Sequence, residues 1–279
     1  MFQNKTSIAI LMATYNGEKY IGEQIDSILK QSNQDWCLFI NDDGSNDETN
    51  TIIRSYQINH PNKIYILEIQ PKRLSASGNF NSLLQNVESR YYMFSDQDDI
   101  WLPTKIEKLY AEMKKNELED EKLPIIVHSD MVVVDNNLEQ IAASFHDYAK
   151  VNPKLSTFNY LGVMNNINGC AMLFNSIAKH ISSKLGDLSV SHDWWIAINV
   201  SKAGKIVFFN ETTLLYRQHE SNVVGANKLS LGLYISKIIS FKSTLRHDVK
   251  HFNHLRSVNY GGPIKYIFYK ILFQFKRHN

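Results

Sequence analysis

Three carboxylates within four residues are the first feature of this sequence that could carry out chemistry. They belong to the segment 95–101, which reads SDQDDIW and lies between the apolar run 91–94 and Pro103. This order predicts a strand that ends in a loop carrying the carboxylates. Carboxylates this close repel one another unless a cation or strong hydrogen-bond donors neutralise them, and oxygen ligands of this kind suit Mg²⁺ or Mn²⁺. A solvated Asp-rich turn before a helix is the alternative.

A second polar loop, 41–47, follows the apolar run 36–40 and reads NDDGSND. Asp43 in this loop can accept the imide N–H of a uracil or thymine ring if the loop faces a ligand crevice. Tyr15, which follows the apolar run 7–13, can stack on the same base. A plain turn that caps a helix and a buried structural tyrosine are the alternatives.

These loops lie between alternating strands and helices in the first hundred residues. Short apolar runs predict strands at 7–13, 36–40, 63–69 and 91–95, and apolar residues at helical spacing follow each of the first three. The alternation predicts right-handed parallel β-α-β units, in which ligands gather at the carboxyl ends of the strands. One edge of the predicted sheet therefore carries Tyr15, Asp43, Arg73 and Asp96.

The second half of the chain is less regular. We predict helices at 103–115, 176–183 and 194–202. Short strands are predicted at 125–127, 131–134, 169–174, 206–209 and 213–216, and an irregular loop with helical pieces at 145–168. The fold class is therefore α/β.

Charge is distributed unevenly along the 279 residues. The net charge is +2, but from Leu229 onward nine basic residues stand against the single acid Asp248, so this tail carries +8 and the remainder −6. An acidic body argues against a nucleic-acid groove across the main fold. Isoleucine and phenylalanine recur in the tail at helical spacing between lysines and arginines, which suits a helix lying on an anionic membrane surface. A helical cap on the main domain or an oligomer contact fits almost as well.

No stretch reaches the roughly 18 apolar residues of a membrane span, and the apolar run at 8–13 is too short for a signal peptide. We therefore expect a cytoplasmic protein, with peripheral contact to the cytoplasmic face of the membrane through its tail. Only Cys37 and Cys170 are present, and their apolar surroundings favour buried, chemically inert side chains.

Four motifs occur in order at fitting separations: ATYN at 13–16, DDGSND at 42–47, SDQDDIW at 95–101 and HDWW at 192–195. Together they resemble the family 2 glycosyltransferases with the GT-A fold, a Rossmann-like nucleotide-binding mixed sheet flanked by helices. The DQDDIW wording resembles the bacterial rhamnosyltransferase branch. The resemblance covers roughly residues 5–226. It implies a catalytic domain at 1–228, with a nucleotide-sugar-binding half at 1–101 and an acceptor-binding half at 102–228, followed by a helical basic region at 229–279.

The resemblance also implies roles for the loop residues. The nucleotide would lie against Thr14, Tyr15, Asp43, Arg73, Asp96 and Arg217. Asp43 would contact the pyrimidine base with Tyr15 against the ring, and Asp96 would hold the ribose and approach the metal. Asp98 would ligate the Mn²⁺ or Mg²⁺ ion that bridges the donor diphosphate. Asp99 is expected to cap the helix that follows.

Asp193 is the expected catalytic base. Inverting transfer needs a carboxylate opposite the leaving group, which takes the proton from the acceptor hydroxyl as this attacks the anomeric carbon. Asp193 stands just before a predicted helix, so capping that helix is an alternative role that is compatible with the first. The neighbouring residues His192, Trp194 and Trp195 are expected to pack behind the base or to face the acceptor.

Arg217 and His219 belong to the segment 216–222, which resembles the Tyr-Arg-x-His-x-x-Asn element of the rhamnosyltransferase branch. A basic pair there would close over the donor diphosphate, with His219 as an additional metal ligand. A solvated loop histidine is the alternative.

The expected activity is that of an inverting, metal-dependent hexosyltransferase. Its donor would be a pyrimidine nucleoside-diphosphate sugar, with dTDP-rhamnose as first choice and a UDP-hexose as second. Its acceptor would be a saccharide or polyprenyl-linked saccharide in cell-surface polysaccharide synthesis. A non-catalytic sugar-nucleotide or glycan-binding module is the alternative from another class, and it predicts a degraded set of carboxylates. A nucleotidyltransferase would need a Gly-rich basic loop where TYNG stands at 14–17.

Overall fold

A computed structural model describes residues 2–3, 6–69, 73–183, 190–219, 251–253 and 255–277. The domain boundary predicted at 228 lies outside the described residues, as do 229–250 of the basic tail.

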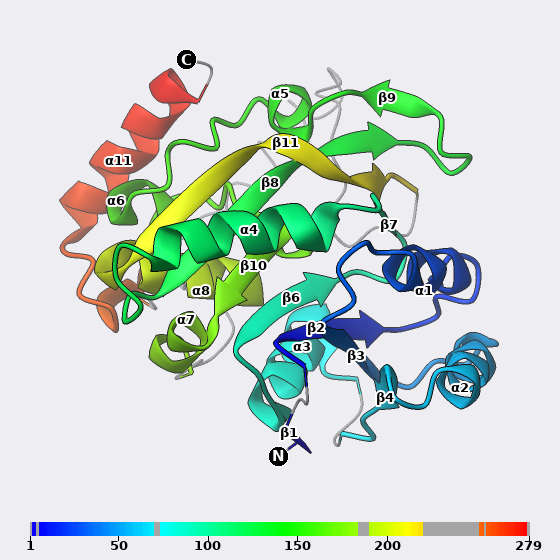
Figure 1. Cartoon of the computed structure of the whole chain (residues 1–279). Helices are drawn as coiled ribbons and strands as arrows, with labels where there is room; N and C mark the ends of the chain where they lie inside the picture. Colours follow the sequence, from blue (N-terminus) through cyan, green and yellow to red (C-terminus); the bar gives the residue numbers. More distant parts are fainter. Residues whose placement is uncertain are drawn as a thin grey trace.

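A nine-stranded mixed sheet forms the centre of the molecule (Figure 1), in the order β4-β3-β2-β6-β10-β8-β11-β7 with β9 paired to β8. Its first part consists of the parallel strands β2 (Ile8–Thr14), β3 (Trp36–Asp42), β4 (Ile64–Ile66) and β6 (Tyr91–Ser95). The predicted β-α-β units are therefore confirmed. Parallel strands end at one edge of the sheet, and the loops that follow β2, β3 and β6 consequently lie next to one another.

The second part of the sheet adds strands in both directions. They are β7 (Ile100–Trp101), β8 (Ile125–Val134), β9 (Gln140–Ala142), β10 (Met172–Asn175) and β11 (Lys205–Arg217). Strand β10 runs antiparallel to both β6 and β8, and it joins the two parts of the sheet. Two pairs of predicted short strands turn out to be single long strands, because β8 and β11 pair in parallel along their length with two register shifts. A separate two-stranded sheet pairs β1 (Phe2–Gln3) with β5 (Val87–Glu88).

Helices cover both faces of the sheet and enclose two hydrophobic clusters. Apolar residues of α1 (Ile21–Leu29), α2 (Thr49–Asn59) and α4 (Lys105–Glu117) belong to one cluster. Residues of α3 (Ser75–Asn86), α7 (Ser176–Ile181) and α8 (His192–Ala203) belong to the other. Strand β2 supplies both, with Ile8, Ile10 and Met12 on one side and Ala9 and Leu11 on the other. Burial on two faces explains why these strands are continuous apolar runs.

The irregular region predicted at 145–168 is confirmed. It contains the short helices α5 (Phe145–Ala149) and α6 (Phe158–Leu161), and a 3₁₀ turn, η1 (Gly169–Ala171), follows it before β10.

The last described helix, α11 (Pro263–Lys276), packs beside α6 at the far end of the sheet from β4 (Figure 1). It buries Tyr266 and Phe273 against the domain. Among the helices that the structure describes, none combines the length and apolarity needed to cross a membrane.

Candidate active site

The two adjacent carboxylates at the end of β3, those of Asp42 and Asp43, make different contacts. Asp42 accepts hydrogen bonds from the Thr14 hydroxyl at 3.0 Å and from the backbone N–H groups of Gly44 and Ser45. Burial alone would raise the pKa of Asp42, but hydrogen bonds from Ser45, Asn50 and Thr14 outweigh it and lower this pKa. Asp42 therefore anchors the turn, and the Thr14 hydroxyl is used to hold it.

Asp43 is buried beside the start of α3, where its Oδ1 accepts a hydrogen bond from the backbone N–H of Leu74 at 2.9 Å. Arg73 precedes that residue and is exposed, with a left-handed backbone conformation (φ +64°). The structure thus brings the predicted residues Asp43 and Arg73 to one corner of the sheet edge.

Tyr15 presents its ring to solvent, with 46% of the residue exposed, while its backbone is fixed. The side-chain amide of Gln97 donates to the Tyr15 carbonyl at 3.0 Å and accepts from the Tyr15 N–H at 2.9 Å. A fixed backbone with an exposed ring suits a stacking surface for a base. The same contacts connect the loop after β2 to the carboxylate loop after β6.

The carboxylates of Asp96, Asp98 and Asp193 lie within electrostatic reach of one another. Burial, followed by repulsion from Asp98 and Asp193, raises the pKa of Asp96 to about 7. Asp96 and Asp98 follow β6, whereas Asp193 comes from α8, almost a hundred residues later. The structure therefore places the predicted metal loop and the predicted base in one site.

His219 approaches Asp98 directly. Its Nε2 lies 2.8 Å from Oδ2 of Asp98, and both side chains are mostly buried, with 10% and 16% exposed. Strand β11 ends at Arg217 and delivers the histidine across the sheet edge. The two residues predicted to bind metal are thus in contact.

A deeper cluster lies behind this pair. One ligand atom each from Asp96, Asp99 and Cys170 lies within 4.8 Å of the others. Lys105, which is fully buried, donates to the Cys170 carbonyl oxygen, and its ammonium lies 4.3 Å from the ring centre of Trp101. The attraction of Lys105 for Asp96 and Asp99 gives this cluster a cation of its own.

The expectation that Asp99 caps the following helix is wrong. Helix α4 begins after Thr104 and has no side-chain cap. Asp99 is instead 1% exposed, and burial, followed by repulsion from Asp98 and Asp96, holds its pKa well above the usual range.

Asp193 is the second residue of α8 and lies inside its first turn, so it does not precede the helix as predicted. Its Oδ2 accepts a hydrogen bond from the backbone N–H of Gly169 at 3.0 Å. Since Cys170 adjoins the Asp96 cluster, the segment 169–170 connects the carboxylate of Asp193 to that cluster.

The three neighbours of Asp193 hold the start of α8 in place. His192 is buried, stacks on Phe80 at 4.3 Å between ring centres and makes an edge-to-face contact with Phe94 at 4.5 Å. Burial lowers the pKa of His192, so its ring is neutral at pH 7. Trp194 and Trp195 donate their indole N–H groups to backbone carbonyls, those of Leu161 and Ser182. All three therefore make packing contacts in this structure.

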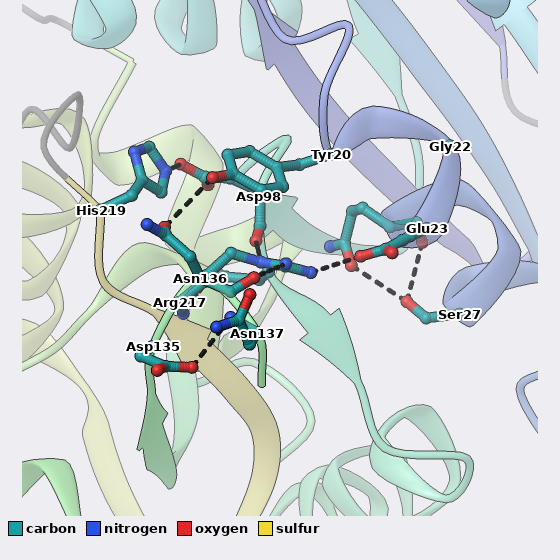
Figure 2. Close-up of polar contacts among 12 residues, drawn as sticks. Tyr20, Gly22, Glu23, Ser27, Asp98, Asp135, Asn136, Asn137, Arg217 and His219 are labelled. Carbon is teal, nitrogen blue, oxygen red and sulfur yellow. Dashed lines mark hydrogen bonds and ion pairs between the residues drawn. The ribbon is translucent and has the colours of Figure 1, made fainter. Parts of the chain in front are cut away.

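Arg217 is buried, and protein groups engage its guanidinium (Figure 2). It contacts Asp98, Asn136 and Glu23, and it lies over the ring of Tyr20. The sequence did not predict the residues that surround Arg217. No local spacing marks Tyr20, Glu23 or Asn136, because they meet only when α1, the loop after β8 and β11 come together.

Comparisons with known proteins decide the family. The Glycosyl transferase family 2 profile matches residues 9–182. The chain belongs to glycosyl transferase family 2. The dTDP-rhamnosyl transferase RfbG of Shigella flexneri is 31% identical to this glycosyltransferase over 229 residues, which cover 77% of the chain and 74% of RfbG. The resemblance of this chain to the family, which was inferred from its four motifs, is therefore confirmed.

Two further relatives extend the comparison. The UDP-Glc:alpha-D-GlcNAc-diphosphoundecaprenol beta-1,3-glucosyltransferase WfgD of Escherichia coli is 29% identical over 154 residues, 55% of this chain and 54% of WfgD. The mannosyltransferase PcManGT from Pyrobaculum calidifontis, solved in complex with GDP-Man and Mn²⁺, superposes with a TM-score of 0.59 at 15% identity. That superposition covers 98% of this chain and 71% of PcManGT, and it shows the fold. The glycosyltransferase therefore has the predicted GT-A architecture.

The residues at the sheet edge of this glycosyltransferase fit a divalent ion. Asp98 and His219 offer a carboxylate oxygen and an imidazole nitrogen, a donor set that accepts Mn²⁺ or Mg²⁺. A bound cation would offset the repulsion that Asp98 and Asp193 exert on Asp96. The deeper cluster already contains the ammonium of Lys105, so a divalent ion would fit the Asp98–His219 pair better than that cluster.

Proposed function

We propose that this glycosyltransferase catalyses inverting transfer of a sugar from a pyrimidine nucleoside-diphosphate donor, with dTDP-rhamnose as first choice. The observation that carries the proposal is the convergence of Asp96, Asp98 and Asp193 at the edge that also carries Tyr15 and Asp43. The name of the Shigella relative supports a dTDP-rhamnose donor, and that of WfgD supports UDP-glucose as the second candidate.

The nucleoside would bind at the corner formed by the loops after β2 and β3. The exposed ring of Tyr15 offers a face for the base. Asp43 offers a carboxylate to the imide N–H, which uracil and thymine share and cytosine lacks. The free oxygen of this group would make that contact, since the other oxygen accepts from Leu74. Arg73, exposed beside it, carries positive charge toward the phosphates.

The diphosphate would lie against Asp98 and His219. A bound Mn²⁺ or Mg²⁺ supplies positive charge for the leaving nucleoside diphosphate. Asp96 interacts electrostatically with both Asp98 and Asp193, which supports the proposal that it holds the ribose near the transferred sugar.

Asp193 would act as the general base. As the acceptor oxygen bonds to the anomeric carbon, the bond from that carbon to the diphosphate oxygen breaks, and the hydroxyl proton moves to the Asp193 carboxylate. The backbone N–H groups of Gly169 and Trp194 bind Oδ2 of Asp193 at 3.0 Å and its Oδ1 at 2.7 Å, and the second lone pair of Oδ1 would accept the hydrogen bond from the acceptor hydroxyl. The neutral ring of His192 beside it keeps the region apolar.

We further propose a saccharide or polyprenyl-linked saccharide as acceptor in cell-surface polysaccharide synthesis. The diphosphoundecaprenol in the name of WfgD supports a lipid-linked acceptor. Helix α11 supports contact with an anionic membrane surface. It leaves five large apolar side chains more than half exposed, at Ile264, Ile267, Phe268, Ile271 and Phe275. Lys265, Lys270 and Lys276 lie on the same helix, which has no acidic residue.

A donor screen tests the proposal. Purified protein is incubated with dTDP-rhamnose, UDP-glucose, UDP-GlcNAc or GDP-mannose, in Mn²⁺ or in EDTA, and the midpoint of thermal unfolding is measured. Polyprenyl-linked saccharides are then added, and the release of nucleoside diphosphate is measured. We expect the largest stabilisation with dTDP- or UDP-sugars in Mn²⁺ and release of dTDP with an acceptor. Preference for GDP-mannose would contradict the pyrimidine pocket, and binding without turnover on any acceptor would favour the non-catalytic module.

A further inference from the structure

Arg217 joins three segments that are far apart in the sequence (Figure 2). Its Nε donates to the Asp98 carbonyl oxygen at 3.0 Å, and its Nη1 donates to the Asn136 carbonyl oxygen at 3.0 Å. Its Nη2 forms an ion pair with Glu23 of α1 at 2.5 Å. The side chain is 3% exposed, so water competes little for these contacts.

Tyr20 completes this arrangement from the start of α1. Its ring lies under the Arg217 guanidinium at 4.5 Å and beside the His219 ring at 4.9 Å between centres. Its hydroxyl donates to the side-chain carbonyl of Asn136 at 3.1 Å. Tyr20 therefore contacts both Arg217 at the end of β11 and His219 just after it, as well as the loop that Arg217 also binds.

The backbone around Arg217 strengthens the connection. Its own N–H lies 3.4 Å from Oδ1 of Asp99, and its Nε binds the carbonyl of Asp98, so the end of β11 contacts two consecutive residues of the carboxylate loop. His219, two residues later, reaches the Asp98 side chain. The distance between the Asp98 carboxylate and the His219 imidazole thus depends on how Arg217 seats β11 against this loop.

We infer that Arg217 is a positioning residue that sets the geometry of the Asp98–His219 metal pair, and that it does not bind the donor diphosphate. The inference rests on the proposed function of this pair. A diphosphate ligand would need guanidinium N–H groups directed at the donor, whereas three different nitrogens of Arg217 donate to protein oxygens. The planar guanidinium reaches three acceptors in fixed directions, and a lysine ammonium on a flexible chain does not.

Arg217→Lys separates the two roles. Mn²⁺ affinity is measured from the electron paramagnetic resonance of free Mn²⁺, with and without dTDP, and dTDP affinity is measured by calorimetry in EDTA. We expect Mn²⁺ affinity to fall at least about tenfold while metal-free dTDP affinity stays within about twofold. Excess Mn²⁺ should restore most of kcat. The matched control is Arg54→Lys, which makes the same change in an exposed ion pair with Glu68 and should alter none of these values.

A loss of metal-free dTDP affinity with unchanged Mn²⁺ affinity would overturn the inference, and so would no change in either. If Arg217→Lys does not fold, Glu23→Gln replaces it, because Glu23 is 56% exposed and its loss leaves the core intact. We then expect a smaller but measurable loss of Mn²⁺ affinity, and wild-type affinity would overturn the inference.

A wild-type protein that binds Mn²⁺ but no nucleotide refutes the proposed function and leaves the metal titrations valid, whereas one that binds no Mn²⁺ refutes the positioning role.

Discussion

Adjacent aspartates in this glycosyltransferase have opposite surroundings. Asp42 accepts hydrogen bonds from several donors and is held ionised, whereas Asp43 keeps one oxygen free of the contacts described above. Asp98 contacts His219, whereas Asp99 is buried next to Cys170. In both pairs the two carboxylates contact different parts of the protein, although they are adjacent in the sequence.

The buried histidine of β8 gives a pH dependence that is independent of the active site. Burial, followed by the nearby His146, lowers the pKa of His128 to about 3. Between this value and the ordinary pKa of about 6.5, the unfolded chain binds a proton that the folded protein does not, so stability is lost as the pH falls. We expect the free energy of unfolding to drop by about 2 kcal/mol between pH 6.5 and 5 through this residue.

Urea unfolding of His128→Leu at pH 7.5 and 5 checks this expectation, since the variant should lose most of that drop. His180→Leu, an exposed replacement of the same type, controls for the change of side chain. Asp130, whose pKa is lowered by hydrogen bonds from His146 and Ser144 despite burial, loses its contribution only at lower pH. An unchanged slope in His128→Leu would contradict the neutral, buried state of this histidine.

At the residue level, the sequence proposed candidate positions for chemistry but could not predict their partners. Residue type and motif order are local properties, and they singled out Asp43, Asp98 and Asp193 as candidates. Which member of an aspartate pair is engaged by protein donors depends on other segments, such as Thr14 for Asp42 and Arg217 for Asp99. The burial of Arg217 depends on α1 and on the loop after β8, so no pattern around 217 could predict it.

At the element level, η1 and α8 meet around the proposed base. A Cβ atom added at Gly169 would lie 3.2 Å from Nε2 of His192 and 3.3 Å from Cβ of Asp193. The glycine thus permits the close approach that its N–H needs to bind Asp193. Since η1 leads directly into β10, the central strand of the sheet fixes the position of the base.

Gly169→Ala should displace the base by a few tenths of an ångström. We expect kcat to fall about tenfold with little change in donor binding, because small misplacements of a reacting group are costly. Steady-state kinetics with calorimetric donor binding measures both. Gly22→Ala is the control, since a Cβ there meets only the Tyr56 hydroxyl at an ordinary 3.6 Å. Wild-type kcat in Gly169→Ala would show that this contact does not position the base.

Element boundaries were predicted best where burial is uniform. The parallel strands β2, β3 and β6 are short apolar runs, and they lie where those runs indicated. Strand β8 was divided in two because His128-Ser129-Asp130 interrupts its apolar pattern. The structure buries all three residues and satisfies two of them through other segments, since Ser129 lies 2.6 Å from the Thr213 hydroxyl and Asp130 accepts from the Ser144 hydroxyl. Such satisfaction by other segments leaves no local signal.

At the scale of the whole molecule, α11 lies at the far end of the sheet from β4 (Figure 1), and its exposed side chains are mostly apolar or basic. We expect the protein to co-sediment with phosphatidylglycerol vesicles at low salt and less at high salt, because both apolar burial and charge contribute. The double variant Ile267→Ser/Ile271→Ser should reduce this binding at least about tenfold. The control Ile58→Ser removes an isoleucine from α2 that is even more exposed, at 76% against 56% for Ile267 and 54% for Ile271. Equal vesicle binding by both variants would show that the apolar side chains of α11 do not contribute to membrane binding.

The proposed mechanism needs a metal-binding loop and a proton acceptor in one site. The direct measurement compares Asp193→Asn with wild type for Mn²⁺-dependent donor binding and for sugar transfer to the acceptor that the screen identifies. We predict donor affinity within about twofold of wild type and a fall in kcat of about 10²- to 10⁴-fold, because asparagine still accepts the Gly169 N–H but cannot take a proton. Transfer at close to the wild-type rate would contradict the assignment of Asp193 and the mechanism built on it.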